Sequence, residues 1–426
     1  MKKFNRIIQP LIMDSLKNYP AVFLNGPRQS GKSTLAHEVL KQLGGEYVSF
    51  DDLSILSAAQ SDPKGFLSQF RRFTVIDEVQ LVPSLFRALK LFIDEKRHQH
   101  PTDANGCFLL TGSANILALP QLSDALVGRV DIVTLFPLSS CEILGLNANF
   151  INAILSTQTN FKMEPACQMN LVDIIEQATF PQIASDPNLN RLRWFDNYFS
   201  TLLQRDVRSL AEIEKIDLLP KMLRSFAARA GGLLNDASMA SDLGINTMTF
   251  RRYRSLLEGV FLLNTIPPWY SNIGKRLVKS PKVYLNDTLG LCNLIGVDVK
   301  EIQNQQSELL GKIVENFVAS ELLKQLSFAH QGTLFHFRTY NNQEIDFIIE
   351  KPNGTLIAIE VKARQTVTQN DFQTMRMLQN ELPTKFSRGI VLYQGDKILP
   401  FGHNLWAMPL SSLWSLKNEA NSNVNP

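Results

Sequence analysis

One short segment, AVFLNGPRQSGKST at residues 21–34, constrains the fold of this chain more than any other. Its first four residues are apolar and predict a strand, while Gly26 and Gly31 bracket a loop that leads into Lys32, Ser33 and a helical stretch. The glycines let the backbone curl so that N–H groups point at phosphate oxygens, and the following helix adds its positive dipole. This is the P-loop pattern in the strand–loop–helix context that it requires. The predicted ATP contacts are Gly26, Pro27, Arg28, Gln29, Ser30, Gly31, Lys32, Ser33 and Thr34.

A second apolar run, residues 73–76 in FTVIDEVQ, predicts a strand buried on both faces of a parallel sheet. It ends in Asp77 and Glu78, at the sheet edge where ligands bind in open α/β sheets. We predict that Asp77 and Ser33 hold Mg²⁺ and that Lys32 reaches the β- and γ-phosphates. Glu78 is then placed to orient and deprotonate the attacking water.

Three further strands are predicted, in EYVSFDD, CFLLTGSAN and DIVTLFPL, which makes a sheet of about five strands. Ser113, at the end of the second of these, is a candidate sensor of the γ-phosphate or of the lytic water. It can equally be part of an ordinary strand-end turn. Arg129, which follows Gly128 in LVGRV, is either an arginine finger for a neighbouring subunit's ATP or a surface ion-pair residue.

Composition limits the remaining choices. Apolar residues make up 44% and charged residues 19% of the 426 residues, which is ordinary globular composition for roughly two to four domains. The net charge is only +3, so any nucleic-acid binding must come from local clusters of Lys and Arg. We find no signal peptide and no run approaching the ~18 apolar residues that span a bilayer, so we predict a cytoplasmic protein. The scattered cysteines, Cys107, Cys141, Cys167 and Cys292, suit a reducing compartment.

The middle of the chain has the spacing of a helix-turn-helix. Residues 217–230 predict one helix, and NDASMASDLGINTMTFRRYRSLLEG predicts two more, separated by a turn at Gly244 with Asn246 as the cap. A basic outer face and a two-stranded basic hairpin would grip DNA phosphates. The alternative is a packing module between the two ends of the chain. The predicted DNA contacts are Arg251, Arg252 and Arg254 on the helix and Lys275, Arg276, Lys279 and Lys282 on the hairpin.

The last part of the chain, residues 311–396, predicts the element order αβββαβ. Asp346 lies on the second strand, and Glu360 and Lys362 lie two residues apart on the third and therefore share a face. The turn KPNG brings Asp346 across from Glu360, and Glu315 lies on the preceding helix. Carboxylates so placed can hold Mg²⁺ beside a scissile phosphate, with Lys362 positioning a water. Charged outer faces of ordinary amphipathic strands give a similar pattern.

In order, GPRQSGKST, VIDEVQLVPSLF, LLTGSA, LVGR and LFPLSSCEI resemble AAA-type ATPases whose second half carries a nuclease-like domain of unknown function. The later blocks ATFPQI, LLQRDV, LEGVFLL and GKIVENFVASEL resemble the same family, and the last domain resembles the PD-(D/E)XK nucleases. The resemblance implies an α/β multidomain fold. It comprises an AAA+ core with a five-stranded parallel sheet (1–137), a helical lid (138–212), a winged helix (213–300) and a restriction-endonuclease-like domain (301–415). The polar composition of the last residues separately predicts a disordered tail (416–426). Arg205 would be the lid arginine at the nucleotide.

Two functions fit this organisation. The first is an ATP- and Mg²⁺-dependent motor, a homo-oligomeric ring that binds and remodels duplex or branched DNA in repair or recombination. The second is a regulatory switch, such as a toxin–antitoxin or defence assembly, in which the nuclease-like domain is a protein-binding platform. Stimulation of ATP hydrolysis by branched DNA, and not by protein partners, would favour the motor.

Overall fold

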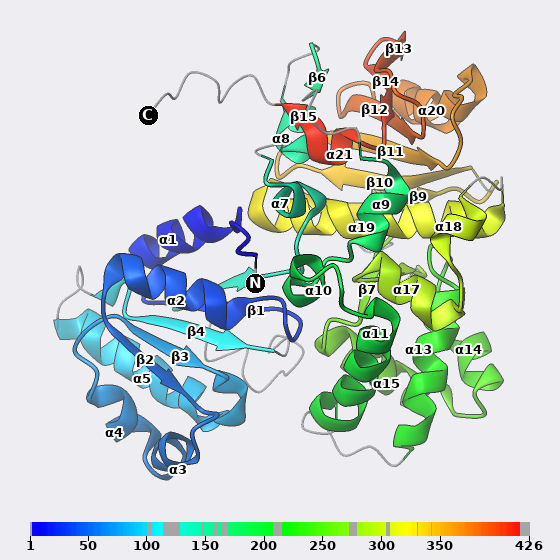
Figure 1. Cartoon of the computed structure of the whole chain (residues 1–426). Coiled ribbons are helices and arrows are strands. Elements are labelled where there is room, and N and C mark those ends of the chain that lie inside the picture. The colour runs from blue at the N-terminus through cyan, green and yellow to red at the C-terminus, as the bar shows by residue number, and fades with distance from the viewer. Residues whose placement is uncertain are drawn as a thin grey trace. The chain divides into compact units, whose positions relative to one another are not determined.

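The computed structural model describes residues 2–99, 104–113, 128–146, 149–156, 160–163, 169–207, 215–271, 279–303, 307–329, 331–341 and 343–417. Contacts divide the chain into two compact units, whose elements are labelled in Figure 1. The N-terminal unit comprises Asn5–Pro137 and Ser255–Leu262, and the C-terminal unit comprises Met1–Phe4, Leu138–Arg254 and Leu263–Pro426. Within the described ranges, no helix is both long and apolar enough to cross a membrane.

The N-terminal unit is built on a five-stranded sheet with the strand order β2-β3-β4-β1-β5. Every pairing in it is parallel, which confirms the five-stranded parallel sheet predicted from the sequence. The order places the strand before the P-loop between β4 and β5, with the strand that ends in Asp77 two positions away. The strands are β1 (Ala21–Asn25), β2 (Glu46–Ser49), β3 (Thr74–Asp77), β4 (Phe108–Gly112) and β5 (Val130–Thr134).

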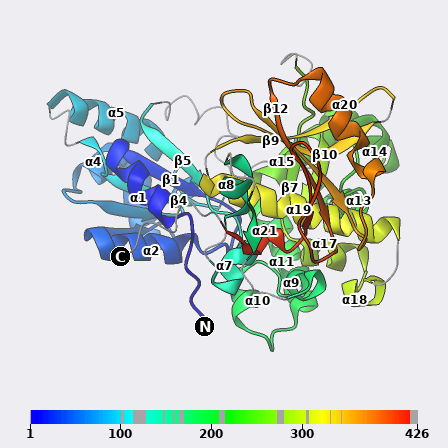
Figure 2. The same ribbon diagram turned by 90° about the horizontal axis from the view of Figure 1, so that it is seen from above.

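Helices cover both faces of this sheet, and Figure 2 shows α2 and α5 on opposite sides of the strands. Side chains alternate along β1, so Phe23 packs edge-on against Phe86 of α5, with ring centroids 6.2 Å apart. The neighbouring Leu24 points to the other face and is fully buried. The helices are α1 (Gln9–Asn18), α2 (Lys32–Leu43), α3 (Leu53–Ser61), α4 (Pro63–Ser68), the short η1 (Val79–Leu81) and α5 (Ser84–Gln99).

The segment predicted as a lid, residues 138–212, groups with the C-terminal unit. The backbone N–H of Ser140 donates to the Glu321 carboxylate at 3.0 Å, and Arg388 donates to the Ile154 carbonyl at 2.7 Å. These bonds join the segment to the C-terminal sheet domain, so its role as a lid stays a prediction. Arg205 is exposed on η4. The elements are α7 (Ser140–Leu144), α8 (Phe150–Leu155), β6 (Lys162–Met163), α9 (Leu171–Glu176), α10 (Pro181–Ser185), α11 (Arg191–Thr201) and η4 (Leu202–Asp206).

The predicted helix-turn-helix forms. Gly244 adopts the left-handed conformation between the helices, with φ +65°, and the Asn246 side chain accepts from the Thr249 N–H at 2.7 Å. Phe250 and Tyr253, three residues apart on α15, are both buried. Two antiparallel strands follow, and the loop between them, with Lys275 and Arg276, lies outside the described residues. The elements are η5 (Ile216–Leu218), α13 (Leu219–Ala228), α14 (Asp236–Asp242), α15 (Thr247–Gly259), β7 (Leu263–Ile266), β8 (Lys282–Leu285), α17 (Thr288–Ile295) and α18 (Val299–Ile302).

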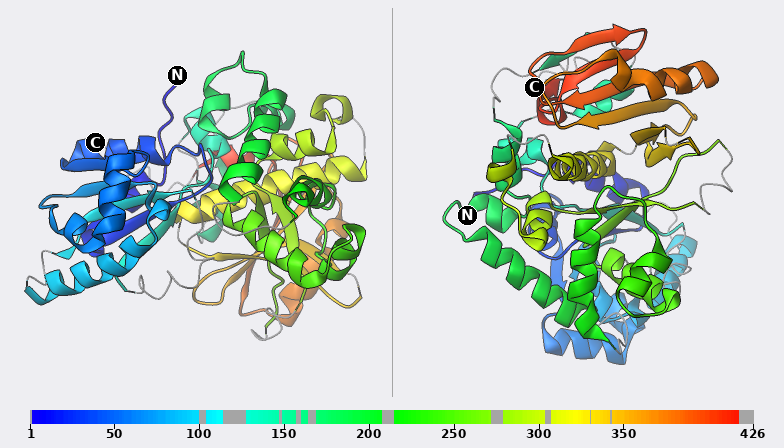
Figure 3. Two further views of the ribbon diagram at one scale, coloured as in Figure 1. Left: turned by 90° about the horizontal axis from the view of Figure 1, so that it is seen from below. Right: turned by 90° about the vertical axis from the view of Figure 1, so that its right-hand side faces the viewer.

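A mixed six-stranded sheet, in the order β13-β14-β12-β11-β10-β9, forms the rest of the C-terminal unit. The long helix α19 lies against one face and α20 against the other (Figure 3), which matches the predicted order αβββαβ. Leu416 and Lys417 pair with β6, so the ordered chain extends past the predicted start of the tail at 416. The elements are α19 (Glu308–Ala329), β9 (Thr333–Arg338), β10 (Glu344–Glu350), β11 (Leu356–Lys362), η6 (Gln369–Phe372), α20 (Gln373–Glu381), β12 (Phe386–Tyr393), β13 (Leu399–Gly402), β14 (Leu405–Pro409), α21 (Ser412–Ser415) and β15 (Leu416–Lys417).

Candidate nucleotide site and acidic cluster

The P-loop connects β1 to α2, and its two glycines are required by the backbone. Gly26 has φ +148°, and a Cβ at this position would lie 2.2 Å from the Leu135 carbonyl oxygen. Gly31 has φ +96° and forms the N-cap of α2 in the left-handed conformation. Side chains other than hydrogen are strained in this region of φ. The residue types at both positions therefore follow from the turn itself.

Lys32 points back into the loop. Its side chain is buried, and its ammonium donates to the carbonyls of Gly26 at 3.0 Å and Pro27 at 2.9 Å. Ser30 Oγ is buried and has no hydrogen-bond partner among the described residues. Ser33 is half-buried at the start of α2. A buried hydroxyl without a partner among the described residues and an ammonium that donates to loop carbonyls fit a loop that receives phosphate oxygens.

Arg6 supports this loop and was missed by the sequence analysis. Its guanidinium donates to the Ser30 carbonyl at 2.7 Å and to the Phe136 carbonyl at 2.6 Å. The fork of the guanidinium thereby ties the P-loop to the segment after β5. An isolated arginine in the N-terminal segment gives no sequence signal for such a contact.

Asp77 lies buried at the carboxyl end of β3. Its carboxylate accepts from Tyr47 Oη at 2.6 Å and from the Thr111 hydroxyl. Burial and the hydrogen bond to Asp77 raise the pKa of Tyr47 above its ordinary value, so the phenol stays a donor. These donors, from β2 and β4, hold the carboxylate at the sheet edge where Mg²⁺ was predicted.

Glu78, Gln80 and Ser113 form a chain of polar side chains at the same edge. Glu78 has φ +59°, and its carboxylate accepts from the Gln80 amide, which also donates to Ser113 Oγ at 3.2 Å. Burial raises the pKa of Glu78, while the Gln80 hydrogen bond and the charge of Lys32 work to lower it. The structure thus joins two predicted site residues through Gln80, which the sequence analysis did not select.

Arg129 forms a bidentate ion pair with Asp94 of α5, with Nε–Oδ1 and Nη2–Oδ2 distances of 2.7 and 2.9 Å. This contact holds the pKa of Asp94 below its usual range. Of the two interpretations of Arg129, the surface ion pair is the one present in the single chain. The finger role stays a prediction.

In the C-terminal unit, two of the predicted acidic residues, Glu315 and Asp346, come together around a lysine with Glu344, which the sequence analysis did not select. Lys282 Nζ lies 2.9 Å from Glu315 Oε1, 2.5 Å from Glu344 Oε1 and 3.4 Å from Asp346 Oδ1. We call the three carboxylates of Glu315, Glu344 and Asp346 the acidic cluster. Lys282 was predicted to grip DNA from an exposed hairpin, and this was wrong, because only 3% of its side chain is exposed. Burial acts to lower the pKa of Lys282, but the three carboxylates outweigh it and raise that pKa.

Glu360 and Lys362 adjoin the acidic cluster through Asp346. Lys362 Nζ donates to Glu360 Oε1 at 2.7 Å, and the Val361 N–H donates to Asp346 Oδ2 at 2.8 Å. The pairing of β10 with β9 changes register between Ile345 and Ile348, so an irregularity of the ladder falls at Asp346 and Phe347. Burial and the charge of Asp346 raise the pKa of Glu360 to about 8.

The same two causes raise the pKa of Glu315 to about 7. Tyr284 Oη donates to Glu315 Oε1 at 2.7 Å, next to the lysine. Among the described residues, no group of three or more His, Cys, Asp or Glu is placed to hold a metal ion. The carboxylates of Glu315, Glu344, Asp346 and Glu360 lie close together here, and the ammonium of Lys282 lies between the first three.

The predicted DNA-binding residues are partly neutralised. Arg251 and Arg254 both pair with Asp236, at 2.8 and 3.0 Å. Arg252 is exposed on α15. Lys279 lies over the ring of Tyr340, 5.1 Å from its centroid, and Tyr340 is 84% exposed. An exposed lysine beside an exposed aromatic ring is a feature of nucleic-acid surfaces.

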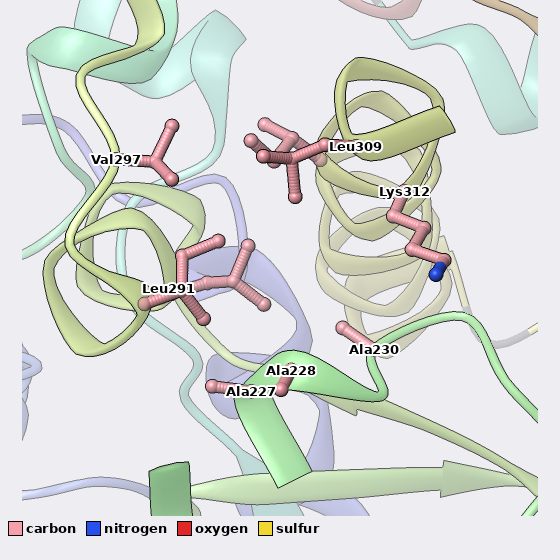
Figure 4. A pocket seen from close by; sticks show the side chains of 9 residues that line it. Ala227, Ala228, Ala230, Leu291, Val297, Leu309 and Lys312 are labelled. Atoms are coloured by element: carbon pink, nitrogen blue, oxygen red, sulfur yellow. The ribbon is translucent and has the colours of Figure 1, made fainter. Parts of the chain in front are cut away.

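A pocket of about 200 Å³ opens between α13, α17 and α19 (Figure 4). Its lining is mostly apolar, with Ala227, Leu291 and Leu309 among the side chains that face it and Lys312 at its edge. None of the predicted site residues lines it.

Comparison with known protein families finds three matching segments along the chain. An AAA domain matches residues 18–144, a domain of unknown function (DUF8612) matches 169–301, and a second (DUF4143) matches 310–413. The chain is homologous to the uncharacterized protein Rv2008c of Mycobacterium tuberculosis, 28% identical over 400 residues, which cover 94% of this chain and 82% of that protein. A tRNA dimethylallyltransferase of Hyphomonas neptunium is 24% identical over 131 residues, 27% of this chain and 40% of that protein. The chain thus carries a P-loop AAA domain followed by two domains of unknown function.

Among solved structures, a Walker-type ATPase of Pyrococcus abyssi matches with a TM-score of 0.42 and 15% identity, over 68% of this chain and 96% of that one. A RuvB variant of Thermotoga maritima matches with a TM-score of 0.31 and 19% identity, over 62% and 90%. No conclusion about function follows from likenesses of this size.

Proposed function

We propose that the N-terminal unit hydrolyses ATP with Mg²⁺ and that the ATPase cycle acts on DNA. The observation that carries the first part is the meeting of Lys32, Asp77, Glu78 and Ser113 at the carboxyl edge of one parallel sheet. Gln80 links Glu78 to Ser113, so a change at the γ-phosphate end can reach the carboxylate that orients water. This arrangement suits phosphoryl transfer, which depends on positioning and charge stabilisation.

Each residue has a distinct role in this proposal. The loop N–H groups and the Lys32 ammonium bind the phosphates, and Lys32 exchanges its bonds to loop carbonyls for phosphate oxygens. Ser33 and Asp77 would hold Mg²⁺, which when bound neutralises phosphate charge. Glu78 accepts a proton from the attacking water at its carboxylate. Arg129 would act in a neighbouring subunit's site only if a homo-oligomeric ring forms and its pair with Asp94 opens.

DNA, duplex or branched, is the partner that we infer for the C-terminal unit. The support is chemical: Arg252 and Lys279 are exposed, and Lys279 is stacked on the exposed ring of Tyr340. Such groups contact phosphates and bases without reading a sequence, which suits remodelling of branched DNA in repair or recombination. We do not propose DNA cutting, because Lys282 fills the acidic cluster.

The decisive experiment measures ATP hydrolysis by the purified chain alone and with single-stranded, duplex and four-way DNA. We expect DNA, most of all branched DNA, to stimulate hydrolysis, and Lys32→Ala to abolish it. Lys279→Ala should weaken the stimulation, and Lys385→Ala, at another exposed lysine of the same unit, serves as the matched control. Hydrolysis by Lys32→Ala at the parent rate would refute the ATPase proposal. Hydrolysis that no DNA stimulates, with no DNA binding at low salt, would refute the DNA partner alone.

A second candidate is an ATP-dependent switch in which the C-terminal domain binds a protein partner. The filled acidic cluster favours it, because a nuclease-like domain whose carboxylates are bound internally is free to serve as a platform. Under this alternative, ATP binding changes the affinity for a protein partner and DNA leaves hydrolysis unchanged.

A further inference from the structure

The first residue of β8 places its ammonium among carboxylates of two other elements. Glu315 belongs to α19, while Glu344 and Asp346 belong to β10, and all three have an oxygen within 3.4 Å of Lys282 Nζ. A lysine ammonium has three N–H donors and no acceptor, so three carboxylate oxygens satisfy it fully. Charged groups are buried only when they are paired in this way. The three N–H donors of the lysine are therefore matched in number by the three carboxylates.

The backbone around Lys282 fixes it in this position. The Leu285 N–H donates to Asn316 Oδ1 at 2.8 Å, which attaches β8 to α19. The Gly231 N–H donates to the Val283 carbonyl at 2.9 Å, and Gly231 lies so close to Glu315 that a Cβ would be 3.0 Å from Oε2. These contacts hold the backbone of β8 beside the carboxylates.

A divalent cation does not fit beside this ammonium. Mg²⁺ demands near-octahedral oxygen ligands at ~2.0–2.1 Å, and one oxygen of each of the three carboxylates is already within 3.4 Å of the Lys282 ammonium. A second positive charge within a few ångströms of a buried ammonium is strongly repelled, because the surroundings screen poorly. In the described part of the chain, no acidic or histidine group is arranged to hold a metal.

We propose that Lys282 is the resident cation of the acidic cluster, so that it closes a latent divalent-cation site and anchors β8 to α19 and β10. The lysine lies in the segment matched at 169–301, and the carboxylates lie in the domain matched at 310–413. The closure is thus a contact between two domains of one chain. It keeps the C-terminal domain from binding a metal while β8 is in place, a property separate from the ATPase proposed above.

The test is a titration of the full chain with Mn²⁺ in the absence of nucleotide, with free Mn²⁺ measured by its electron paramagnetic resonance signal. Four proteins are compared: the parent, Lys282→Met, Asp346→Asn and the double variant. We expect the parent and Asp346→Asn to bind Mn²⁺ alike. Lys282→Met should gain one Mn²⁺ site, so that its affinity for Mn²⁺ at the cluster is at least tenfold higher than that of the parent. The double variant should lack this site. All four proteins have the same nucleotide site, so any Mn²⁺ that binds there does not affect the comparison between them.

Two results would overturn the proposal. One is Mn²⁺ binding by the parent that Asp346→Asn removes, because the cluster would then hold a metal with Lys282 in place. The other is a folded Lys282→Met protein that gains no site. If Lys282→Met does not fold, the parent and Asp346→Asn decide the question between them, equal binding supporting the proposal and unequal binding refuting it. Lys279→Met, nearby on the same segment, controls for loss of a lysine.

Discussion

Replacing Arg6 should loosen the P-loop while every residue that is predicted to contact nucleotide keeps its own side chain. Arg6→Ala removes two hydrogen bonds from a charged donor, at 2.7 Å to Ser30 and 2.6 Å to Phe136. Such bonds contribute ~1.5–3 kcal/mol each, and we take the lower figure because the site is only partly buried, which gives about 3 kcal/mol in total. Arg6→Lys should lose about half of this, since a single ammonium cannot bridge both carbonyls as the planar fork does.

The assay is amide hydrogen exchange of the peptide that spans residues 26–34. A loss of about 3 kcal/mol in local opening free energy corresponds to roughly 100-fold faster exchange, and Arg6→Lys should give roughly tenfold. All four tryptophans, Trp194, Trp269, Trp406 and Trp414, lie in the C-terminal unit, so tryptophan fluorescence should show unchanged unfolding there. Lys17→Ala, exposed on α1, is the control. Exchange in Arg6→Ala within twofold of the parent would show that Arg6 does not hold the loop.

Further predictions address backbone strain, proton transfer and pH. Gly26→Ala should lower the free energy of unfolding of the N-terminal unit by ~1–3 kcal/mol, because its Cβ would meet a carbonyl 2.2 Å away. Gly311→Ala, in α19 with open space around it, should instead raise thermal stability by about 0.5–1 kcal/mol. Gln80→Ala removes a hydrogen bond that lowers the pKa of Glu78, so the acid limb of the hydrolysis rate against pH should move to higher pH. The pKa of Glu360 is raised from 4.5 to about 8, so the folded state binds this proton more tightly than the unfolded state and loses stability as pH rises through that window. Glu360→Gln should therefore flatten the fall of the free energy of unfolding with pH, measured by chemical unfolding.

The sequence predicts most of the nucleotide site because its determinants are local. Gly26 and Gly31 are set by the conformation of one turn, and Asp77 follows directly from the end of an apolar strand. The helix-turn-helix is predicted for the same reason, since Gly244 and Asn246 act on residues next to them. Local rules of this kind require no knowledge of what packs against the segment.

The residues that sequence analysis missed or misplaced act across long separations. Arg6 donates to Ser30 and Phe136, which lie 24 and 130 positions further along the chain, and no local sequence pattern marks Arg6. Lys282 was assigned to an exposed hairpin because other lysines surround it. The sequence carries one signal against this assignment: Lys282 is the first residue of the run KVYL, in which it shares a strand face with Tyr284. In the structure every residue of this strand is buried. The positive charge of Lys282 suggested a DNA contact, but its burial in the structure shows that it pairs with carboxylates instead.

Helix α19 shows why the carboxylate of Glu315 need not imply a metal. The helix is buried on most of its surface, so water cannot satisfy its polar side chains and each must find a partner within the protein. Its neighbours do so by holding other segments: Asn316 accepts from the Leu285 N–H, Ser320 donates to the Asn286 carbonyl, Glu321 accepts from the Ser140 N–H, and Gln325 donates to the Leu413 carbonyl. Glu315 follows the same rule with Lys282 and Tyr284 as its partners. Buried polar side chains that attach separate segments to α19 thus determine how the unit packs. Glu315 is one of them, and its carboxylate is the same group that a metal site would use.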